Sequence, residues 1–312
     1  MKNPKTRPAA TEGRNPRTRH LDQKSTREIL RVLNYEDAQA PGSVAKEIPA
    51  IARAVDAIVR ALRRGGRLIY VGAGTSGRLA VLDAAECPPT FGVPPRLVCA
   101  IIAGGSRALT HEAEGAEDSP TKGARDLRAA NLTSRDAVVG LTASGSTPYV
   151  LGAVDYARKR GAVTVGVTAN RRSPIARAAR ILIAPETGPE AIAGSTRLKA
   201  GTAQKLVLNM LSTAAMVRLG CVYDNWMINV ALTNQKLRRR GLRILEQATG
   251  ARLSRVEHAL RQSGHDLRTA LVMLKTRTPA AEARQMIARA GGDLRQALGE
   301  NGKPRASRRA GR

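Results

Sequence analysis

The sequence predicts an α/β protein in which a five-stranded parallel sheet is flanked by helices, with a small helical domain at the C-terminus. Five short apolar runs, each bounded by Gly, Pro, Ser or Asn, indicate the strands, because their hydrophobicity is continuous and strands buried on both faces have this pattern. Helical segments separate most of these runs, as expected for parallel strands joined by crossover helices. The runs span residues 67–74, 96–105, 136–145, 162–170 and 179–188.

Two helices are expected before the first strand. Ser25 and Glu28 have the spacing of a capping box, and apolar residues follow on one helical face. A second helix is expected over about 43–64, because apolar residues recur there at three- and four-residue steps until Gly65–Gly66.

Further helices are expected between and after the strands, over about 76–86, 120–130, 147–160, 173–178 and 199–219. The last of these is long and nearly apolar, so it lies either centrally or at a subunit interface, and we expect a homodimer. Near the C-terminus, SGHDLRTAL (263–271) recurs as AGGDLRQAL (290–298), which predicts helices that start at Asp266 and Asp293.

The charge of the chain is strongly basic and is concentrated at its ends. The 312 residues include 52 Lys and Arg against 25 Asp and Glu, a formal net charge of +27. Residues 1–20 carry a net charge of +5 and residues 236–312 one of +13. We interpret this excess as composition bias and solvated tails, with an accessory polyanion contact as the alternative. Aromatic platforms and zinc-finger spacings are absent, so nucleic acid is not an expected partner.

Composition also excludes several classes of protein. No apolar run approaches 18 residues, so we expect no transmembrane helix, and the basic N-terminus is not followed by the apolar stretch of a secretory signal. Cys87, Cys99 and Cys221 lie far apart without a CxxC pair, which favours a reducing, cytoplasmic location. The four histidines form no ligand pair at helical spacing, so no metal site is expected.

The loop after the first strand, GAGTSGR (72–78), has the form GxGxxG of a dinucleotide-binding turn. A site for NAD would also need an acidic residue at the end of the second strand, where this chain has Ala103-Gly104-Gly105. The loop is therefore interpreted as a turn at a helix N-terminus that binds an anion, with Thr75 and Ser76 as hydroxyl donors.

The loop after the third strand, TASGSTP (142–148), has the same character. It offers Ser144, Ser146 and Thr147 before another helix. Either loop alone is also compatible with ordinary helix capping. Two such loops in one sheet favour a phosphate monoester, and the lack of a P-loop Lys favours a small phosphorylated metabolite over ATP.

Acidic residues gather in two places that suit acid–base chemistry. Residues 108–121 contain no Lys or Arg but have Glu112, Glu114, Glu117 and Asp118. Asp83 and Glu86 are expected to close the helix over 76–86, where the helix dipole disfavours carboxylates. Two carboxyl groups near a phosphate-binding turn would suit general acid–base catalysis on a sugar phosphate. Solvated surface acids are the alternative.

Together these loops resemble the sugar isomerase (SIS) domain, a flavodoxin-like three-layer sandwich that binds phosphosugars. More narrowly, the chain is similar to the N-acetylmuramic acid 6-phosphate etherases over about residues 11–300. The stretches that carry the resemblance are TEGRNP (11–16), GRLIYVGAGTSGRLAVLDAAECPPTFGV (66–93), GAED (115–118), TASGSTPYV (142–150) and GSTRLKAGTAQKLVLNMLST (194–213).

The resemblance implies cleavage of the D-lactyl ether of N-acetylmuramic acid 6-phosphate by elimination and water addition, without a cofactor. It implies Glu86 as proton donor and Glu117 as the second acid or base. It also implies that the loop hydroxyls hold the phosphate, with further substrate contacts nearby; these residues are Thr75, Ser76, Ser144, Ser146, Thr147, Gly74, Ser195 and Thr196. Ala193 departs from the family pattern, in which we expect a hydroxyl residue.

We expect the chain to divide into five segments, of which the basic extension and the basic tail lie outside the resemblance. These are a basic extension (1–20), N-terminal helices (21–58), the phosphosugar-binding domain (59–222), a helical region (223–300) and a basic disordered tail (301–312). Three other functions remain open: a non-catalytic sugar-phosphate-binding regulator, a nucleic-acid-associated protein and an aldose–ketose isomerase of the same fold.

Overall fold

The computed structural model describes residues 10–111, 113–230, 232 and 234–300. The expected tail (301–312), the first nine residues of the extension and Glu112 lie outside the described residues. The chain divides into two compact units. The first comprises the chain up to Pro88 together with Pro94–Ala215, and the second comprises Pro89–Val93 and the chain from Met216 onward. The finer five-segment division stays a prediction.

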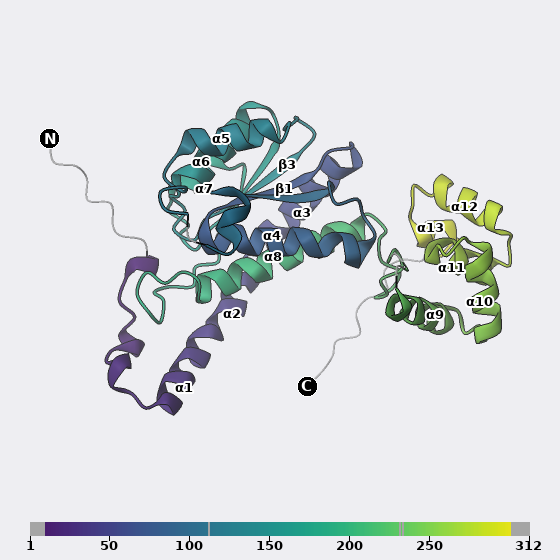
Figure 1. The fold of residues 1–312 in the computed structure, drawn as a ribbon, viewed down its shortest axis with the longest axis horizontal. Coiled ribbons are helices and arrows are strands. Elements are labelled where there is room, and N and C mark those ends of the chain that lie inside the picture. The colour runs from purple at the N-terminus through teal and green to yellow at the C-terminus, as the bar shows by residue number, and fades with distance from the viewer. Residues whose placement is uncertain (1–9, 112, 231, 233, 301–312) are drawn as a thin grey trace. The chain divides into compact units, whose positions relative to one another are not determined.

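One parallel sheet forms the centre of the first unit (Figure 1). Its strands are β1 (Leu68–Gly72), β2 (Val98–Ile102), β3 (Ala137–Leu141), β4 (Val163–Val167) and β5 (Ile181–Ile183), in the order β2-β1-β3-β4-β5. Each strand lies within one of the predicted apolar runs, so the predicted fold class is confirmed. The strand order reverses between β1 and β3, which is where sheets of this kind bind ligands. Because Gly72 pairs with Leu141, the loops after β1 and β3 begin side by side.

Helices cover both faces of the sheet (Figure 1). One side carries α5 (Pro120–Ala129), α6 (Pro148–Lys159) and α7 (Pro174–Ala178); the other carries α3 (Ile48–Arg63), α4 (Gly74–Phe91) and α8 (Lys199–Arg218). Side chains alternate along β1 accordingly: Ile69 and Val71 belong to the core cluster that includes α6, whereas the Tyr70 hydroxyl donates a 3.0 Å hydrogen bond to Asp83 of α4. The core of this unit is almost entirely aliphatic, as the composition predicts.

The N-terminal region differs from the prediction at one point. Short 3-10 turns η1 (Ala10–Glu12), η2 (Pro16–Thr18) and η3 (Leu21–Gln23) precede α1 (Thr26–Asp37), which begins with the predicted capping box. The prediction of a single helix over 43–64 is wrong, because the chain forms α2 (Gln39–Ala45) and α3 with a break between them. Pro49 lacks the N–H that would bond to the Ala45 carbonyl in a continuous helix.

The first crossover helix also extends further than the sequence indicates. We expected Glu86 to lie at its C-terminus, but α4 continues to Phe91, so that expectation is wrong. Pro88 and Pro89 lie inside the helix, where each leaves one carbonyl of the preceding turn without its N–H donor. The end is fixed beyond the prolines, where Phe91 is buried and its carbonyl accepts a 2.5 Å hydrogen bond from Asn229 Nδ2.

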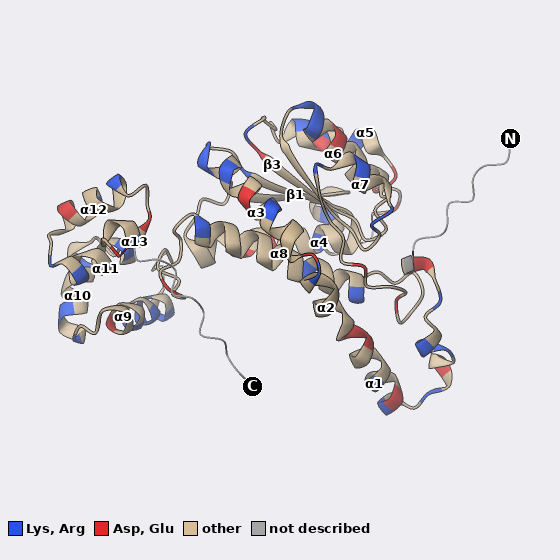
Figure 2. Ribbon diagram, turned by 180° about the vertical axis from the view of Figure 1, so that it is seen from behind, with Lys and Arg blue, Asp and Glu red and all other residues tan. Residues whose placement is uncertain are grey.

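The second unit is helical. It contains α9 (Gln235–Thr249), α10 (Leu253–Gln262), α11 (Leu267–Thr276), α12 (Ala280–Arg289) and α13 (Leu294–Ala297), packed around one core cluster. The repeated sequence behaves as predicted, since Asp266 and Asp293 are the N-caps of α11 and α13 and accept hydrogen bonds from backbone N–H groups. Five Lys and Arg residues lie on α9 (Figure 2). Among the described residues, no helix is long and apolar enough to cross a membrane.

A buried ion pair joins the N-terminal segment of the first unit to α8. Glu36 of α1 and Lys199 are each 1% exposed, and Lys199 Nζ lies 2.5 Å from Glu36 Oε2. Asn15 Nδ2 donates to the same oxygen at 2.8 Å, and Arg17 Nε donates to Oε1 at 2.6 Å. Burial disfavours the charged carboxylate, but the hydrogen bonds from Arg17, Lys199 and Asn15 outweigh it and lower the pKa of Glu36 to about 2.

This pKa predicts acid sensitivity. Because the pKa of Glu36 in the folded protein lies below its ordinary value of 4.5, the carboxylate stabilises the fold above pH 4.5 and loses that effect as the pH falls toward 2. We expect this group to contribute about 3 kcal/mol to the decrease in the free energy of unfolding over that range. Urea unfolding at several pH values between 5 and 2 measures it. The Glu36→Gln variant is expected to show a flatter pH dependence, whereas a matched change at exposed Asp22 (Asp22→Asn) is expected to keep the wild-type slope. An unchanged slope in Glu36→Gln would contradict the assignment.

Candidate functional site

The loop after β1 is compact because two glycines allow close backbone contact. A Cβ on Gly72 would lie 2.7 Å from the backbone nitrogen of Gly77, and a Cβ on Gly77 would lie 2.5 Å from Ile102 Cγ1. Gly74, the first residue of α4, has a φ of +51° and is exposed. The predicted turn at a helix N-terminus is therefore present.

The two hydroxyl residues of this loop have different surroundings. Ser76 is buried, and its hydroxyl donates a 2.8 Å hydrogen bond to Gln204 Oε1 of α8. The Nε2 group of Gln204 is buried without a hydrogen-bond partner. Thr75 is half-buried. A Cβ placed on Gly201 of α8 would lie 3.6 Å from Thr75 Cγ2 and 3.4 Å from the carbonyl oxygen of Thr196. Thr75 and Thr196 therefore both lie close to Gly201 at the start of α8.

The loop after β3 is a network of hydroxyl groups. Thr142 Oγ1 lies 2.8 Å from Thr147 Oγ1 and 3.4 Å from Ser144 Oγ, and it accepts a hydrogen bond from the backbone N–H of Gly145. The Ser146 hydroxyl donates to Ser144 Oγ at 3.0 Å. Thr147 is the N-cap residue of α6, but its side chain makes no capping hydrogen bond. The Thr147 hydroxyl therefore contacts Thr142 and does not cap α6.

The start of α8 touches both loops. Ala200 packs with Ala143 of the second loop and with Ala169, while Gly201 lies against Thr75 of the first loop. Ser195, which precedes Thr196 in the segment leading into α8, is half-buried. Both loops thus adjoin the start of α8 at one edge of the sheet, and Ser195 and Thr196 lie just before this helix in the chain.

The N-terminus of α8 already carries a carboxylate. Glu190 is fully buried and accepts hydrogen bonds from the backbone N–H groups of Lys199 (3.0 Å) and Ala200 (2.9 Å). Burial raises the pKa of Glu190, although the two backbone hydrogen bonds act in the opposite direction. Because Glu190 occupies these N–H groups, the N-termini of α4 and α6 are the ones available to an anion at this edge.

Glu117 lies beside the two loops. Its backbone carbonyl accepts a 2.9 Å hydrogen bond from the N–H of Tyr149 in the first turn of α6. The preceding Ala116 belongs to the same core cluster as Ala73 of the first loop and Tyr149. The Glu117 side chain is exposed in the single chain, as are those of Glu114 and Asp118.

Arg78 is a residue that the sequence reasoning missed. Its Nε donates to the carbonyl of Ala108 at 3.0 Å and its Nη2 donates to that of His111 at 3.2 Å. These bonds hold the segment after β2, including η4 (Gly105–Leu109), against the first turn of α4. Gln204 was missed as well. Both lie inside stretches that carry the family resemblance (66–93 and 194–213), which is the one signal that could have found them.

Glu86 is not brought to the loops. It is exposed on α4, eleven positions after Thr75, and this spacing corresponds to about three turns and about 16 Å along the helix axis. Of the two predicted catalytic carboxyl groups, one therefore lies beside the two hydroxyl-lined loops of its own chain and the other does not. Among the described residues, no group of three or more His, Cys, Asp and Glu could hold a metal ion.

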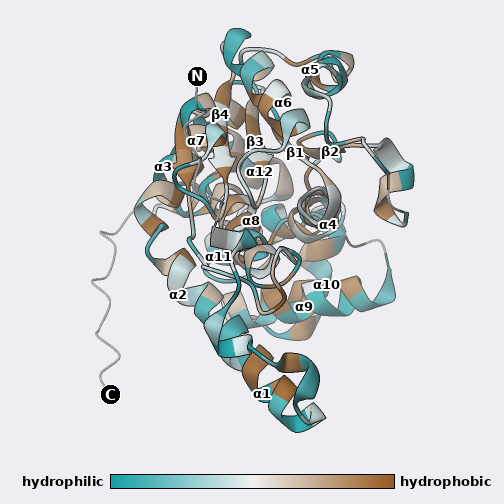
Figure 3. Cartoon of the chain, turned by 90° about the vertical axis from the view of Figure 1, so that its left-hand side faces the viewer, coloured by the Kyte–Doolittle hydropathy of each residue, from teal (hydrophilic) through white to brown (hydrophobic). Residues whose placement is uncertain are grey.

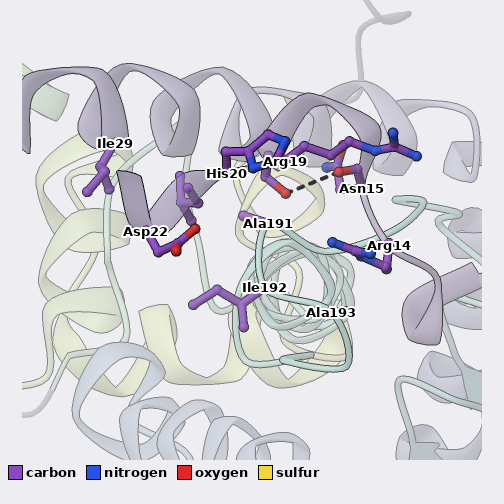
Figure 4. A pocket seen from close by; sticks show the side chains of 11 residues that line it. Arg14, Asn15, Arg19, His20, Asp22, Ile29, Ala191, Ile192 and Ala193 are labelled. Carbon is purple, nitrogen blue, oxygen red and sulfur yellow. Dashed lines mark hydrogen bonds between the residues drawn. The ribbon is translucent and has the colours of Figure 1, made fainter. Parts of the chain in front are cut away.

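A cavity of about 490 Å³ adjoins the segment that leads to Ser195 and Thr196 (Figure 4). Its lining combines residues of the N-terminal turns, such as Arg14, Arg19 and His20, with the apolar residues 191–193. Ala193, the residue that departs from the family pattern, lines this cavity. None of the loop hydroxyl residues lines this cavity, so the departure changes none of them.

Comparison with known proteins defines the class. Residues 50–158 match the family model of the glucokinase regulatory protein N-terminal SIS domain, and residues 109–214 match that of the SIS domain. A phosphoheptose isomerase structure from Francisella tularensis has this fold with a TM-score of 0.50 and 21% sequence identity, covering 62% of this chain and 100% of that one. The fold and the two hydroxyl-lined loops are thus those of a SIS-domain protein.

Closer relatives define the family. The N-acetylmuramic acid 6-phosphate etherase of Pectobacterium atrosepticum is 54% identical over 288 residues, which cover 92% of this chain and 95% of that protein. That of Rhizobium rhizogenes is 52% identical, covering 92% and 94%. The chain belongs to the N-acetylmuramic acid 6-phosphate etherase family, so the resemblance noted from the sequence is confirmed.

The second loop offers a test of the anion site. Gly145 has a φ of +77°, and a Cβ there would lie 2.0 Å from Ser173 Oγ. We expect Gly145→Ala to shift the loop and weaken the binding of glucosamine 6-phosphate at least about tenfold, measured by calorimetry. Gly250→Ala is the matched control, because Gly250 has a φ of +69° with nothing within 4 Å. Equal binding by the two variants would place the anion site elsewhere.

Proposed function

We propose that this protein cleaves the D-lactyl ether bond of N-acetylmuramic acid 6-phosphate, giving N-acetylglucosamine 6-phosphate and D-lactate. The observation that carries the proposal is the junction of two hydroxyl-lined loops at the start of α8, in a chain 52–54% identical to proteins named for this activity. A purely regulatory sugar-phosphate binder would need the loops but not the two glutamates.

In the proposed complex the phosphate group lies at the N-termini of α4 and α6. Hydroxyl groups from both loops and free backbone N–H groups would hold its oxygens, and the helix dipoles favour its negative charge. The half-buried Thr75, Ser144 and Thr147 are supported as ligands by their position at this edge. The buried side chain of Gln204 accepts the hydrogen bond of the Ser76 hydroxyl and so positions Ser76, and its Nε2 group has no hydrogen-bond partner.

The proposed reaction is an elimination followed by an addition. A base removes the proton from C2 of the open-chain aldehyde, the C2–H electron pair forms a C2–C3 double bond, and the C3–O bond to lactate breaks. The leaving ether oxygen takes a proton from a carboxyl group, which general acid catalysis requires for so poor a leaving group. Water then adds its oxygen to C3 and a proton returns to C2, so the net change is hydrolysis.

We assign Glu86 as the proton donor to the ether oxygen and Glu117 as the second acid or base. The position of Glu117 beside both loops supports its role, because an atom of a sugar whose phosphate is bound there lies within reach of that segment. The assignment of Glu86 rests on its place in the AAECPPT stretch.

We also propose that the protein is a cytoplasmic homodimer. Large apolar side chains are exposed on the first unit, including Leu30 (59%) and Tyr35 (55%) on α1 and Leu82 (47%) on α4. Figure 3 shows hydrophobic positions along the ribbon of α1. Exposed apolar surface of this kind is typical of protein–protein interfaces. The three cysteines are all free, which suits a reducing compartment.

The proposal predicts loss of turnover on removal of one carboxyl group. Glu117→Gln is expected to lower kcat for D-lactate release at least about 100-fold, because a group that transfers a proton in the transition state contributes that much or more. Glu114→Gln, which changes an exposed glutamate three positions away, is the matched control and is expected to keep the wild-type rate. D-lactate is measured with a coupled dehydrogenase. Wild-type protein that binds the substrate without releasing lactate would favour the regulatory alternative instead.

A further inference from the structure

The sheet of the first unit has an open edge along β2. Among the described strands β2 pairs with β1 and with no other, and Figure 3 shows it at the end of the sheet, between α4 and α5. The carbonyl of Leu97 and the N–H of Ala103 both form hydrogen bonds with β1, at 2.9 and 3.0 Å. Because alternate residues of a strand turn their backbone groups to opposite sides, the N–H and C=O groups of Val98, Ala100 and Ile102 face the open edge.

A cavity of about 760 Å³ adjoins this edge. Apolar residues from three elements contribute to its lining: Ala100 and Ile101 of β2, Val81 of α4 and Leu109 of η4. Ala100, Ile101 and Val81 are half-buried, and Leu109 is 38% exposed. The described part of the chain therefore leaves both the backbone and the apolar side chains of this edge accessible to a ligand.

Positive charge lies on the α5 side of the cavity. Lys122 and Arg125, about one turn apart on α5, are both exposed and line the cavity together with Asp126. Asp126 accepts a 2.7 Å hydrogen bond from the Tyr149 hydroxyl, and its 3.7 Å pair with Arg125 is exposed and therefore weak. The α5 side of the cavity therefore attracts negatively charged groups.

The unpaired backbone groups of β2 favour a peptide over other apolar ligands. An alkyl or aromatic ligand would remove these N–H and C=O groups from water without giving them partners, which costs free energy. An extended peptide beside β2 would satisfy them, as in other proteins that add a strand to an exposed sheet edge. A second copy of the same edge is disfavoured, because antiparallel pairing of β2 with β2 would place Lys122 and Arg125 of both copies on one face of the joined sheet.

The two sides of the cavity also specify which side chains such a peptide would carry. Ala100 pairs with Tyr70, whose hydroxyl bonds to Asp83 of α4, so Ala100 and Val81 form the α4 side. Side chains of an added strand alternate between the two faces of the sheet. Every second side chain would therefore meet this apolar side, and the others would meet the cations of α5.

We propose that the open edge of β2 binds an extended acidic peptide of another protein as an additional strand. Small apolar side chains of the peptide lie on the α4 side, and its Asp or Glu side chains lie beside Lys122 and Arg125. The backbone of the peptide exchanges hydrogen bonds with Val98, Ala100 and Ile102. This interaction is separate from ether cleavage and does not depend on the proposed function.

Binding of designed peptides to the full-length protein tests the proposal by fluorescence anisotropy. The probe is a labelled, blocked peptide of alternating Val and Glu, about as long as β2, and the same peptide with Lys in place of Glu is expected to bind at least about tenfold more weakly. Two further versions are N-methylated at all Val or at all Glu positions, which removes the N–H donors along one side of the strand or the other. Only one side faces β2, so one version is expected to lose at least about tenfold in affinity while the other keeps it.

Matched protein variants locate the binding site. Lys122→Glu is expected to weaken binding of the Val-Glu peptide at least about fivefold. Arg128→Glu is the control, because Arg128 is exposed on the same helix but lies over the Tyr156 ring, 5.6 Å from its centroid, and does not line the cavity.

Three results would overturn the proposal. They are the absence of binding of the Val-Glu peptide up to about 1 mM, equal affinities of the two N-methylated peptides, and equal effects of Lys122→Glu and Arg128→Glu. The experiment includes no turnover step, so its outcome is independent of the proposed function.

Discussion

Three consecutive residues at the start of α8 hold together parts of the chain that are far apart in sequence. Lys199 pairs with Glu36 of α1 in a buried, hydrogen-bonded contact. Ala200 packs against Ala143 in the loop after β3, and Gly201 lies against Thr75 in the loop after β1. Ala200 is 1% exposed, so a larger side chain at this position would push the loop after β3 away from α8. The site therefore depends on this junction.

The junction also settles which helix ends can receive an anion. The carboxylate of Glu190 accepts hydrogen bonds from the first N–H groups of α8, so this helix end is already neutralised from inside the protein. The ends of α4 and α6 have no such internal carboxylate bound to them among the described contacts, and they follow the two strands that flank the reversal of strand order. The anion site proposed at these two helix ends therefore depends little on the net charge of +27, whose excess lies mostly in residues 1–20 and 236–312.

Local sequence patterns predicted the features that local physics determines. Continuous apolar runs located all five strands, the spacing of Ser25 and Glu28 located a capping box, and the repeated Gly-Asp pattern located two helix starts. The end of α4 was predicted wrongly, because Pro88 and Pro89 are tolerated inside a helix whose last turn is held by burial of Phe91. Packing of this kind between distant residues produces no periodic pattern of apolar residues in the sequence.

Long-range contacts were beyond the reach of pattern reasoning. The Glu36–Lys199 and Ser76–Gln204 contacts join residues separated by 163 and 128 positions, and neither can be inferred from spacing or composition. The distance between Glu86 and the loops follows from helix geometry once the extent of α4 is known, but the sequence suggested a shorter helix. Candidate residues could therefore be named from the sequence, whereas the separation of Thr75 and Glu86 along α4 could not be predicted.

Ether cleavage by the proposed elimination requires removal of the C2 proton, and turnover in deuterated water tests this step most directly. The reaction is carried out on N-acetylmuramic acid 6-phosphate, and the N-acetylglucosamine 6-phosphate formed is examined by mass spectrometry and NMR. Elimination followed by water addition predicts one deuterium at C2 of the sugar for each D-lactate released, because the proton that returns to C2 comes from solvent. Release of D-lactate with the original hydrogen retained at C2 would contradict the account.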